Sequence, residues 1–126
     1  MSNVSPRAEP STPPPVTAAF SPRLEGKRVR WTWSDGPVKG SVHEHVFHTN
    51  GTVTWTCLAG EGQGHTQTEK RCLAVPVSQN VDLVSYLSSA SGYTLTVALN
   101  FLDHTLVGVA SNGKEWMPAQ GTFEVT

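Results

Sequence analysis

Apolar and polar side chains alternate along much of the chain after Leu24, with a period of two residues. The clearest case is 27–34 (KRVRWTWS), where Val29, Trp31 and Trp33 alternate with polar residues. Because neighbouring side chains of a strand point to opposite faces, this pattern predicts a β-strand with three apolar side chains on one face. Extended runs predict further strands over 41–48, 52–58, 65–73, 81–88, 93–101, 105–110 and 121–126. No segment of useful length shows the 3.6-residue period of an amphipathic helix.

Turn signals separate these runs. The dipeptides Asn50-Gly51 and Asn112-Gly113 supply the positive φ angles of tight hairpins, and three glycines within 60–64 indicate a loop at the mouth of the fold. About eight short strands joined by hairpins are typical of a sandwich or a barrel, and a barrel is favoured because it removes exposed strand edges. We therefore predict an all-β fold, a single antiparallel up-and-down β-barrel that is wide enough to hold one small ligand, as in lipocalins.

The first 22 residues differ from the rest in composition. They contain six of the nine prolines, no glycine and a single aromatic residue, Phe20. Such a segment cannot bury enough apolar surface to offset the entropy of ordering, so we predict a disordered arm over 1–22 and a barrel domain over 23–126. The three prolines at 13–15 resemble a polyproline ligand for a partner domain, but a plain solvated extension is favoured.

Composition narrows the range of partners. The formal net charge is -1, with 15% charged residues and no basic stripe, which argues against a nucleic-acid partner. The sequence lacks the roughly 18 continuous apolar residues of a membrane span and lacks a secretory leader, so no membrane partner is expected and the cytoplasm is the expected compartment. Cys57 and Cys72 are expected to be reduced thiols, although the sequence is also compatible with a single disulfide between them. The sequence is also compatible with a homodimer.

Three tryptophans are expected to share the inner wall of this barrel. Trp31 and Trp33 lie on the apolar face of the first strand, and the following hairpin brings Trp55 close to them. Indole rings can simply fill a barrel, and that is the simpler interpretation. However, a buried indole N–H needs a hydrogen-bond partner, which a polar ligand in a pocket would supply.

Two histidines are predicted to face the same interior. Side chains alternate within 41–48, so His43, His45 and Phe47 share one face while Glu44 lies on the other. Because Phe47 should share a side with Trp55, we place the histidines inside. Glu44 is then expected to make a hydrogen bond on the surface.

Two imidazoles at this spacing form half of a metal site, for which His65 or His104 would be a third ligand. A cupin-type HxH motif is followed by a glutamate a few residues later, and 47–50 contains none. Hydrogen bonding, proton transfer or a plain position at the barrel rim is therefore favoured over metal binding, and no cofactor is expected. Cys57, next to a strand tryptophan, is expected to be a small core residue.

Four segments, taken in order, resemble a known group of proteins, the MoaF-like and phenolic acid decarboxylase-like branch of the calycin, or lipocalin-like, barrels. The segments are GKRVRWTWSDGPVKG, HEHVFHTNGTVTW, VDLVSYLSSASGYTLTVALNF and LVGVASNGKEW. The resemblance covers nearly everything from Leu24 to Thr126. It implies a barrel with an aromatic-lined cavity, and the MoaF group is linked by name to molybdenum cofactor biosynthesis.

The catalytic residues of the decarboxylases in this branch do not recur here. Those enzymes act without a cofactor on hydroxycinnamic acids, using two tyrosines of the first strand, an arginine and a glutamate. The corresponding positions are Trp31, Trp33, the neighbourhood of His65 and the neighbourhood of Ser88. Indole has no acidic hydroxyl, and serine does not exchange protons at neutral pH as a tuned carboxyl does, so decarboxylation is not expected.

We therefore expect a small-molecule-binding barrel whose pocket takes a planar or apolar ligand. One alternative is a cofactor-free lyase or isomerase acting on a phenolic or enone compound, with His43 and His45 as general acid or base and His65 as a third candidate. A second alternative is a partner-binding module recruited through the Pro-rich arm. The expected ligand contacts are Trp31, Trp33, Phe47, Trp55, Ser88 and Tyr93.

Overall fold

The computed structural model describes residues 20–126, which form nine antiparallel strands joined by turns. The strands are β1 (Arg28–Asp35), β2 (Val42–Phe47), β3 (Val53–Ala59), β4 (Thr66–Glu69), β5 (Cys72–Ser78), β6 (Val81–Leu87), β7 (Thr94–Asn100), β8 (Thr105–Ser111) and β9 (Trp116–Val125). Within these residues the structure has no helix. The prediction of an all-β fold is thereby confirmed.

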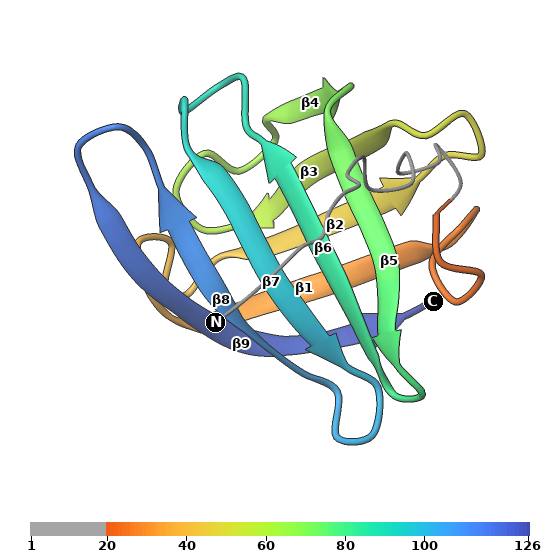
Figure 1. Ribbon diagram of the computed structural model, residues 1–126. Coiled ribbons are helices and arrows are strands. Elements are labelled where there is room, and N and C mark those ends of the chain that lie inside the picture. The colour runs from red at the N-terminus through yellow and green to blue at the C-terminus, as the bar shows by residue number, and fades with distance from the viewer. Residues whose placement is uncertain (1–19) are drawn as a thin grey trace, which may run out of the picture.

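The strands form one sheet in which each is paired with its neighbours along the chain, apart from β4 and β5. The sheet order is β4-β3-β2-β1-β9-β8-β7-β6-β5, so that β1 pairs with β9 and the sheet curls into a nearly closed barrel (Figure 1). The seam of the barrel lies between β4 and β5. This is the up-and-down topology that consecutive hairpins predict, with one strand more than expected.

One predicted strand is divided in two. The pattern over 65–73 predicts a single strand, and this is wrong, because β4 and β5 are separate elements joined through Lys70 and Arg71 and lie on opposite sides of the seam. Pro76, expected beyond the strand, lies inside β5. An edge strand tolerates proline, and the β5–β6 ladder shifts register between Pro76 and Ser78.

A turn at 21–26 closes one end of the barrel. Phe20 and Leu24 are buried there, and Phe20 packs edge-on against Phe47 with ring centroids 5.5 Å apart. Arg23 spans the same end and forms an ion pair of 2.5 Å with Asp82, a fully buried carboxylate. The start of the described chain and the C-terminus both lie at this end (Figure 1).

The predicted disordered arm falls almost wholly outside the described residues and stays a prediction. Of its last three residues, Phe20 and Ser21 are buried, and the Ser21 N–H donates to the Ala74 carbonyl of β5 at 2.7 Å. Contacts with the barrel therefore begin before residue 23, where the domain was expected to start.

Large and small side chains are distributed unevenly around the interior. Two tryptophans of β1 point inward, whereas β8 and β9 contribute glycine and alanine at several inward positions. A Cβ on Gly108 would lie 1.8 Å from the carbonyl oxygen of Thr96, and one on Gly121 would lie 2.1 Å from that of Thr32, so only glycine fits at either position. The inward residues of these strands are Val29, Trp31 and Trp33 on β1, Leu106, Gly108 and Ala110 on β8, and Met117, Ala119, Gly121 and Phe123 on β9.

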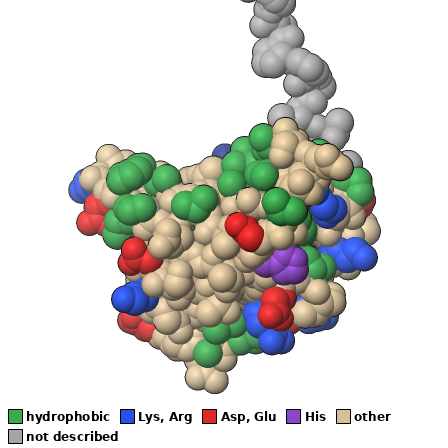
Figure 2. Space-filling view, turned by 90° about the horizontal axis from the view of Figure 1, so that it is seen from below, with side chains coloured by type: hydrophobic (Ala, Val, Ile, Leu, Met, Phe, Trp, Pro, Cys, Tyr) green, Lys and Arg blue, Asp and Glu red, His purple; other side chains and the backbone are tan. Residues whose placement is uncertain are grey.

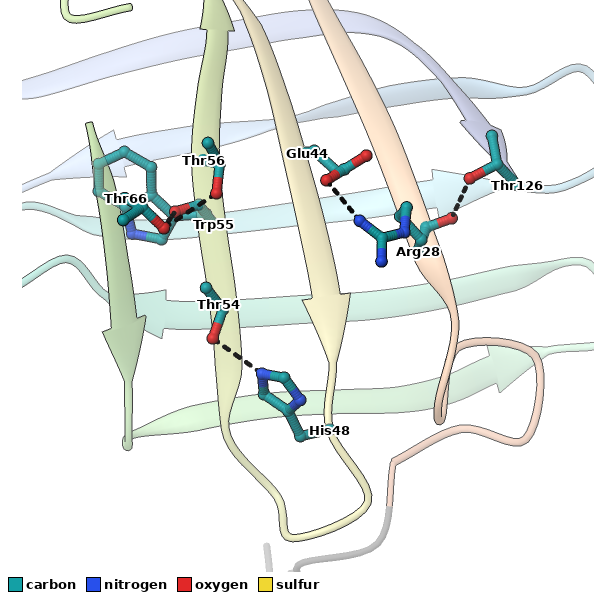
Figure 3. Close-up of polar contacts among 8 residues, drawn as sticks. All are labelled: Arg28, Glu44, His48, Thr54, Trp55, Thr56, Thr66 and Thr126. Atoms are coloured by element: carbon teal, nitrogen blue, oxygen red, sulfur yellow. Dashed lines mark hydrogen bonds and ion pairs between the residues drawn. The ribbon is translucent and has the colours of Figure 1, made fainter. Parts of the chain in front are cut away.

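The outer face of β1 to β4 is polar. Arg28 donates to Glu44 at 2.9 Å, and His48 hydrogen-bonds Thr54 at 2.8 Å, while the ring of Trp55 lies on the other side of the sheet (Figure 3). The prediction that Glu44 faces outward and makes a surface hydrogen bond is confirmed. The same alternation places His43 and His45 inside, as predicted.

The charged side chains are dispersed. Figure 2 shows acidic and basic groups scattered over one face of the molecule among apolar ones, without a patch of one sign. Among residues 20–126, no helix is long and apolar enough to cross a membrane.

Candidate functional site

A cavity of about 340 Å³ occupies the end of the barrel opposite the 21–26 turn. Inward side chains of most strands line it, together with Pro37 and Val38 from the β1–β2 connection and Ala90 and Ser91 from the β6–β7 connection. The cavity exists because β9, which pairs with β1, and its neighbour β8 contribute only Ala110, Met117 and Ala119 at this level, beside the aromatic side chains of β1 to β3.

A hydrogen bond between two cavity-lining rings determines the tautomer of His43. The Nε1–H of Trp33 donates to Nδ1 of His43 at 2.9 Å. Because indole can only donate, Nδ1 must be without a proton, and the neutral imidazole carries its proton on Nε2. Burial lowers the pKa of His43, which favours this neutral form. Nε2 makes no hydrogen bond to the described residues, so His43 presents an uncommitted N–H donor.

His45 is more deeply buried and is held by two aromatic residues. Its ring stacks on Trp31 with centroids 3.7 Å apart, and its Nε2 lies 2.8 Å from the hydroxyl of Tyr86. Burial, with a smaller contribution from His43, holds the pKa of His45 well below 6.5. Burial, followed by Cys72 and Glu69, raises the pKa of Tyr86. Both groups are therefore neutral near pH 7, and either can be the donor of this hydrogen bond.

A buried carboxylate supports the cavity wall across the seam. Glu69, at the end of β4, is 2% exposed. Its Oε2 accepts a hydrogen bond of 2.8 Å from Nε1 of Trp55, and its Oε1 accepts one of 2.9 Å from the hydroxyl of Ser89 in the β6–β7 turn. The backbone N–H of Ser89 donates to the same carboxylate at 3.2 Å. Glu69 thus positions a cavity tryptophan and joins β4 to the turn beyond β6.

Sequence reasoning did not identify Glu69 as part of the site. The residue belongs to the run 65–73, which predicts one strand with no definite inward face. In the structure, Val53 of β3 pairs with Glu69, so both point into the barrel. The available signal was the alternation of 66–69 (TQTE), which places Glu69 and Gln67 on one face once the strand is known to end there.

The structure separates the predicted ligand contacts into two levels. Trp33, Trp55, Ser88 and Tyr93 line the cavity, together with His43 and His45. Trp31 and Phe47 are fully buried beneath it and do not line it. Tyr93 lies at the mouth, where its hydroxyl donates to Glu115.

The other two histidines considered for the site lie apart from the cavity lining. His65 is exposed at the start of β4, with its ring 5.2 Å from that of Trp55. His104 lies in the β7–β8 turn at the opposite end of the barrel, where it stacks on Phe123. Among residues 20–126, no three His, Cys, Asp or Glu side chains gather in a metal-binding arrangement. Cys57 is buried, as expected of a core residue, and both cysteines are free thiols.

The lining is polar at a few points only and carries no formal charge. Of the 15 residues that line the cavity in the described part of the chain, none is Lys, Arg, Asp or Glu. The polar side chains are those of His43, His45, Tyr86, Ser88, Ser91 and Tyr93. Such a site can bind an apolar ring and orient it through a small number of neutral hydrogen bonds.

Comparison with protein-family models gives a match. The family model described as the MoaF C-terminal domain matches residues 18–108, more than two thirds of the 126 residues. The match covers β1 to β7 and part of β8, and so includes the rings of β1, β2 and β3 that line the cavity. No curated protein matches the sequence.

Proposed function

The chain belongs to the MoaF C-terminal domain family, and we propose that it is a small-molecule-binding barrel that takes a planar, largely apolar ligand. The observation that carries this proposal is the cavity of about 340 Å³ between the tryptophans of β1 and β3 and the small residues of β8 and β9. Small-molecule sites typically occupy roughly 300–1,000 Å³ and combine apolar walls with a few polar groups.

The size of the cavity limits the ligand. An engineered cavity of roughly 150 Å³ accommodates benzene. A volume of about 340 Å³ is about twice that value and suits a molecule of two fused rings, or one ring with a short substituent. Stacking against the rings of Trp33 and Trp55 and release of water from the walls would supply most of the affinity.

One contact supports a second candidate function, a cofactor-free lyase or isomerase. Tyr86 lines the cavity and its hydroxyl lies 2.8 Å from Nε2 of His45, so a proton can pass between the two groups during a reaction. His43 is less suited to act as a base, since its Nε2 already carries a proton in the tautomer that Trp33 selects. Turnover of a bound phenolic or enone compound that is lost in Tyr86→Phe, with binding retained, would establish this candidate; full activity of the variant would exclude it.

The binding proposal is tested with naphthalene as the probe of the cavity. In ¹⁵N NMR spectra, naphthalene should shift the indole N–H signals of Trp33 and Trp55. The variant Ala110→Leu fills the cavity from β8 and should weaken naphthalene binding by roughly tenfold or more, because the probe then overlaps the new side chain. The matched control is Ala98→Leu, since Ala98 lies on β7 and pairs with the exposed Val107. Equal binding by both variants would exclude this cavity as the site.

A further inference from the structure

We infer that the cavity selects uncharged ligands that carry a carbonyl oxygen and excludes carboxylates. This inference rests on the proposed function and names the chemical class of ligand for the same site. It follows from three features: the absence of a cation in the described lining, a hydrogen bond that keeps His43 neutral, and a carboxylate behind one wall.

The first feature is the missing counter-charge. A carboxylate that leaves water for an apolar cavity needs a cation or several N–H donors, and without them its transfer costs several kcal/mol. The described lining contains neither Lys nor Arg, so only His43 or His45 could become cationic beside the ligand. His45 is already engaged through Nε2 with Tyr86 and is 1% exposed.

The second feature is the contact of Trp33 with His43, which opposes formation of an imidazolium. Both nitrogens of a protonated imidazole are donors, so protonation would turn Nδ1 into an N–H that faces the indole N–H across 2.9 Å. The existing hydrogen bond would be lost, and two donors would point at each other. Burial of His43 also lowers its pKa and so favours the neutral imidazole.

The titratable groups around His43 do not reverse this tendency. His45 lies on the same strand and is neutral near pH 7, so it supplies no negative charge that would favour an imidazolium at His43. Cys57 on β3 pairs with His43 and is a buried thiol. Tyr86 on β6 and Tyr93, just before β7, line the same cavity, and both have raised pKa values and are neutral near pH 7.

The third feature is Glu69, which lies behind Trp55. Its carboxylate accepts hydrogen bonds from Trp55 and from both donors of Ser89, an arrangement that suits the ionised form. A second carboxylate inside the cavity would therefore be repelled by the like charge of Glu69 beyond the indole ring.

A neutral carbonyl compound suits the same site well. Its oxygen can accept the hydrogen bond that Nε2–H of His43 offers, while its rings contact the tryptophans. The hydroxyl of Tyr86 can accept from or donate to a second polar atom, because neutral His45 can either donate to that hydroxyl or accept from it, depending on its tautomer. The ligand class is therefore an uncharged amide, ketone or lactone attached to one or two rings.

Three probes of nearly equal shape separate this inference from the proposed function. Naphthalene tests the cavity alone, 2-naphthamide adds a neutral carbonyl, and 2-naphthoate replaces the amide with an isosteric carboxylate. At pH 7.5 we expect 2-naphthamide to bind somewhat more tightly than naphthalene and more than roughly a thousandfold more tightly than 2-naphthoate, of which only about one molecule in 3,000 is then neutral. Dissociation constants come from NMR titration of the Trp33 and Trp55 indole signals.

Acidification provides a test that needs no variant. The carboxyl group of the probe has a pKa of about 4, so its neutral fraction rises roughly tenfold for each pH unit between pH 7.5 and 5.5. The apparent affinity for 2-naphthoate should rise by the same factor per pH unit, starting as soon as the pH falls below 7.5. The affinity for 2-naphthamide should stay constant over this range. A pH-independent affinity for 2-naphthoate would contradict the inference.

The variant Trp33→Phe tests the role of the indole donor. Without that donor, Nδ1 of His43 can bind a proton, so the His43 ring signals in NMR should titrate at a higher pH and the discrimination between 2-naphthamide and 2-naphthoate should shrink by about tenfold. The matched control is Trp116→Phe, which also replaces an indole but at an exposed residue outside the cavity lining; its discrimination should stay close to that of the unmodified protein.

Each outcome decides between the two proposals. Failure of all three probes to bind would overturn the proposed function and this inference together. If naphthalene binds but 2-naphthoate binds as well as 2-naphthamide, the inference is overturned and the proposed function stands. Binding of naphthalene with rejection of both polar probes would also overturn it, because the wall would then offer no usable donor.

Discussion

The two ends of the barrel interior are built from similar residues but are packed differently. At the end closed by the 21–26 turn, Phe20, Leu24, Phe47 and Phe123 fill the space, and each is at most 6% exposed. At the opposite end a cavity of about 340 Å³ remains between aromatic rings and small residues. The difference shows that the same alternation of inward side chains produces a core where large residues meet, and a pocket where large residues have alanines as neighbours.

The largest expected effect compares two leucines of β7 that point inward, one at each end. Leu99 is fully buried in the closed end, whereas Leu95 lines the cavity. Leu99→Ala should lower the free energy of unfolding by about 3 kcal/mol, because it leaves a void in a packed core. Leu95→Ala should cost about 1 kcal/mol, since its side chain already borders empty space. Urea denaturation measures both, and equal losses would mean that the two ends are packed alike.

The ion pair at the closed end should have the next largest effect. Arg23→Ala removes the partner of Asp82, whose other oxygen has no hydrogen bond to the described residues. A buried carboxylate left alone is costly, but Arg23 is 29% exposed and its pairing is partly screened, so we expect a loss of about 2 kcal/mol.

The control for that variant is Arg28→Ala. Arg28 pairs with Glu44 on the outer face, and its side chain is 56% exposed, so its removal should cost under about 1 kcal/mol. If the two arginine variants unfold at the same urea concentration, the buried ion pair does not stabilise the closed end.

The pH dependence of stability should distinguish the cavity end by a smaller amount. His43 and His45 both have pKa values below 6.5 in the folded protein because of burial. Below pH 6.5 the unfolded chain therefore binds more protons than the folded one, and the free energy of unfolding falls as the pH falls, by up to about 1.4 kcal/mol per pH unit for each histidine.

His45→Phe tests this origin of the pH dependence. The variant removes one titrating group, so its stability should decline less steeply between pH 6.5 and 5.5, whatever its absolute stability. Curves of free energy against pH that run parallel for the variant and the unmodified protein would show that His45 does not contribute in this range.

The fold was predictable from local pattern because the pattern acts through local geometry. The alternation in 27–34 predicts β1, and Asn50-Gly51 predicts the β2–β3 hairpin, in which Gly51 adopts a φ of 87°. The inward placement of His43 and His45 follows from counting residues across that turn. The division of 65–73 into β4 and β5 was not predictable, since its cause is the position of the barrel seam, which depends on all nine strands.

The sequence by itself determined an all-β barrel, its hairpins and the faces that carry Trp31, Trp33, His43 and His45, because side-chain alternation and turn geometry are properties of neighbouring residues. Only the tertiary structure decided which of these residues border empty space. Trp33 lines the cavity and Trp31 does not, since the depth of a residue depends on the distant strands opposite it. The contacts of Trp33 with His43, His45 with Tyr86, and Glu69 with Trp55 likewise depend on how separate strands are brought together.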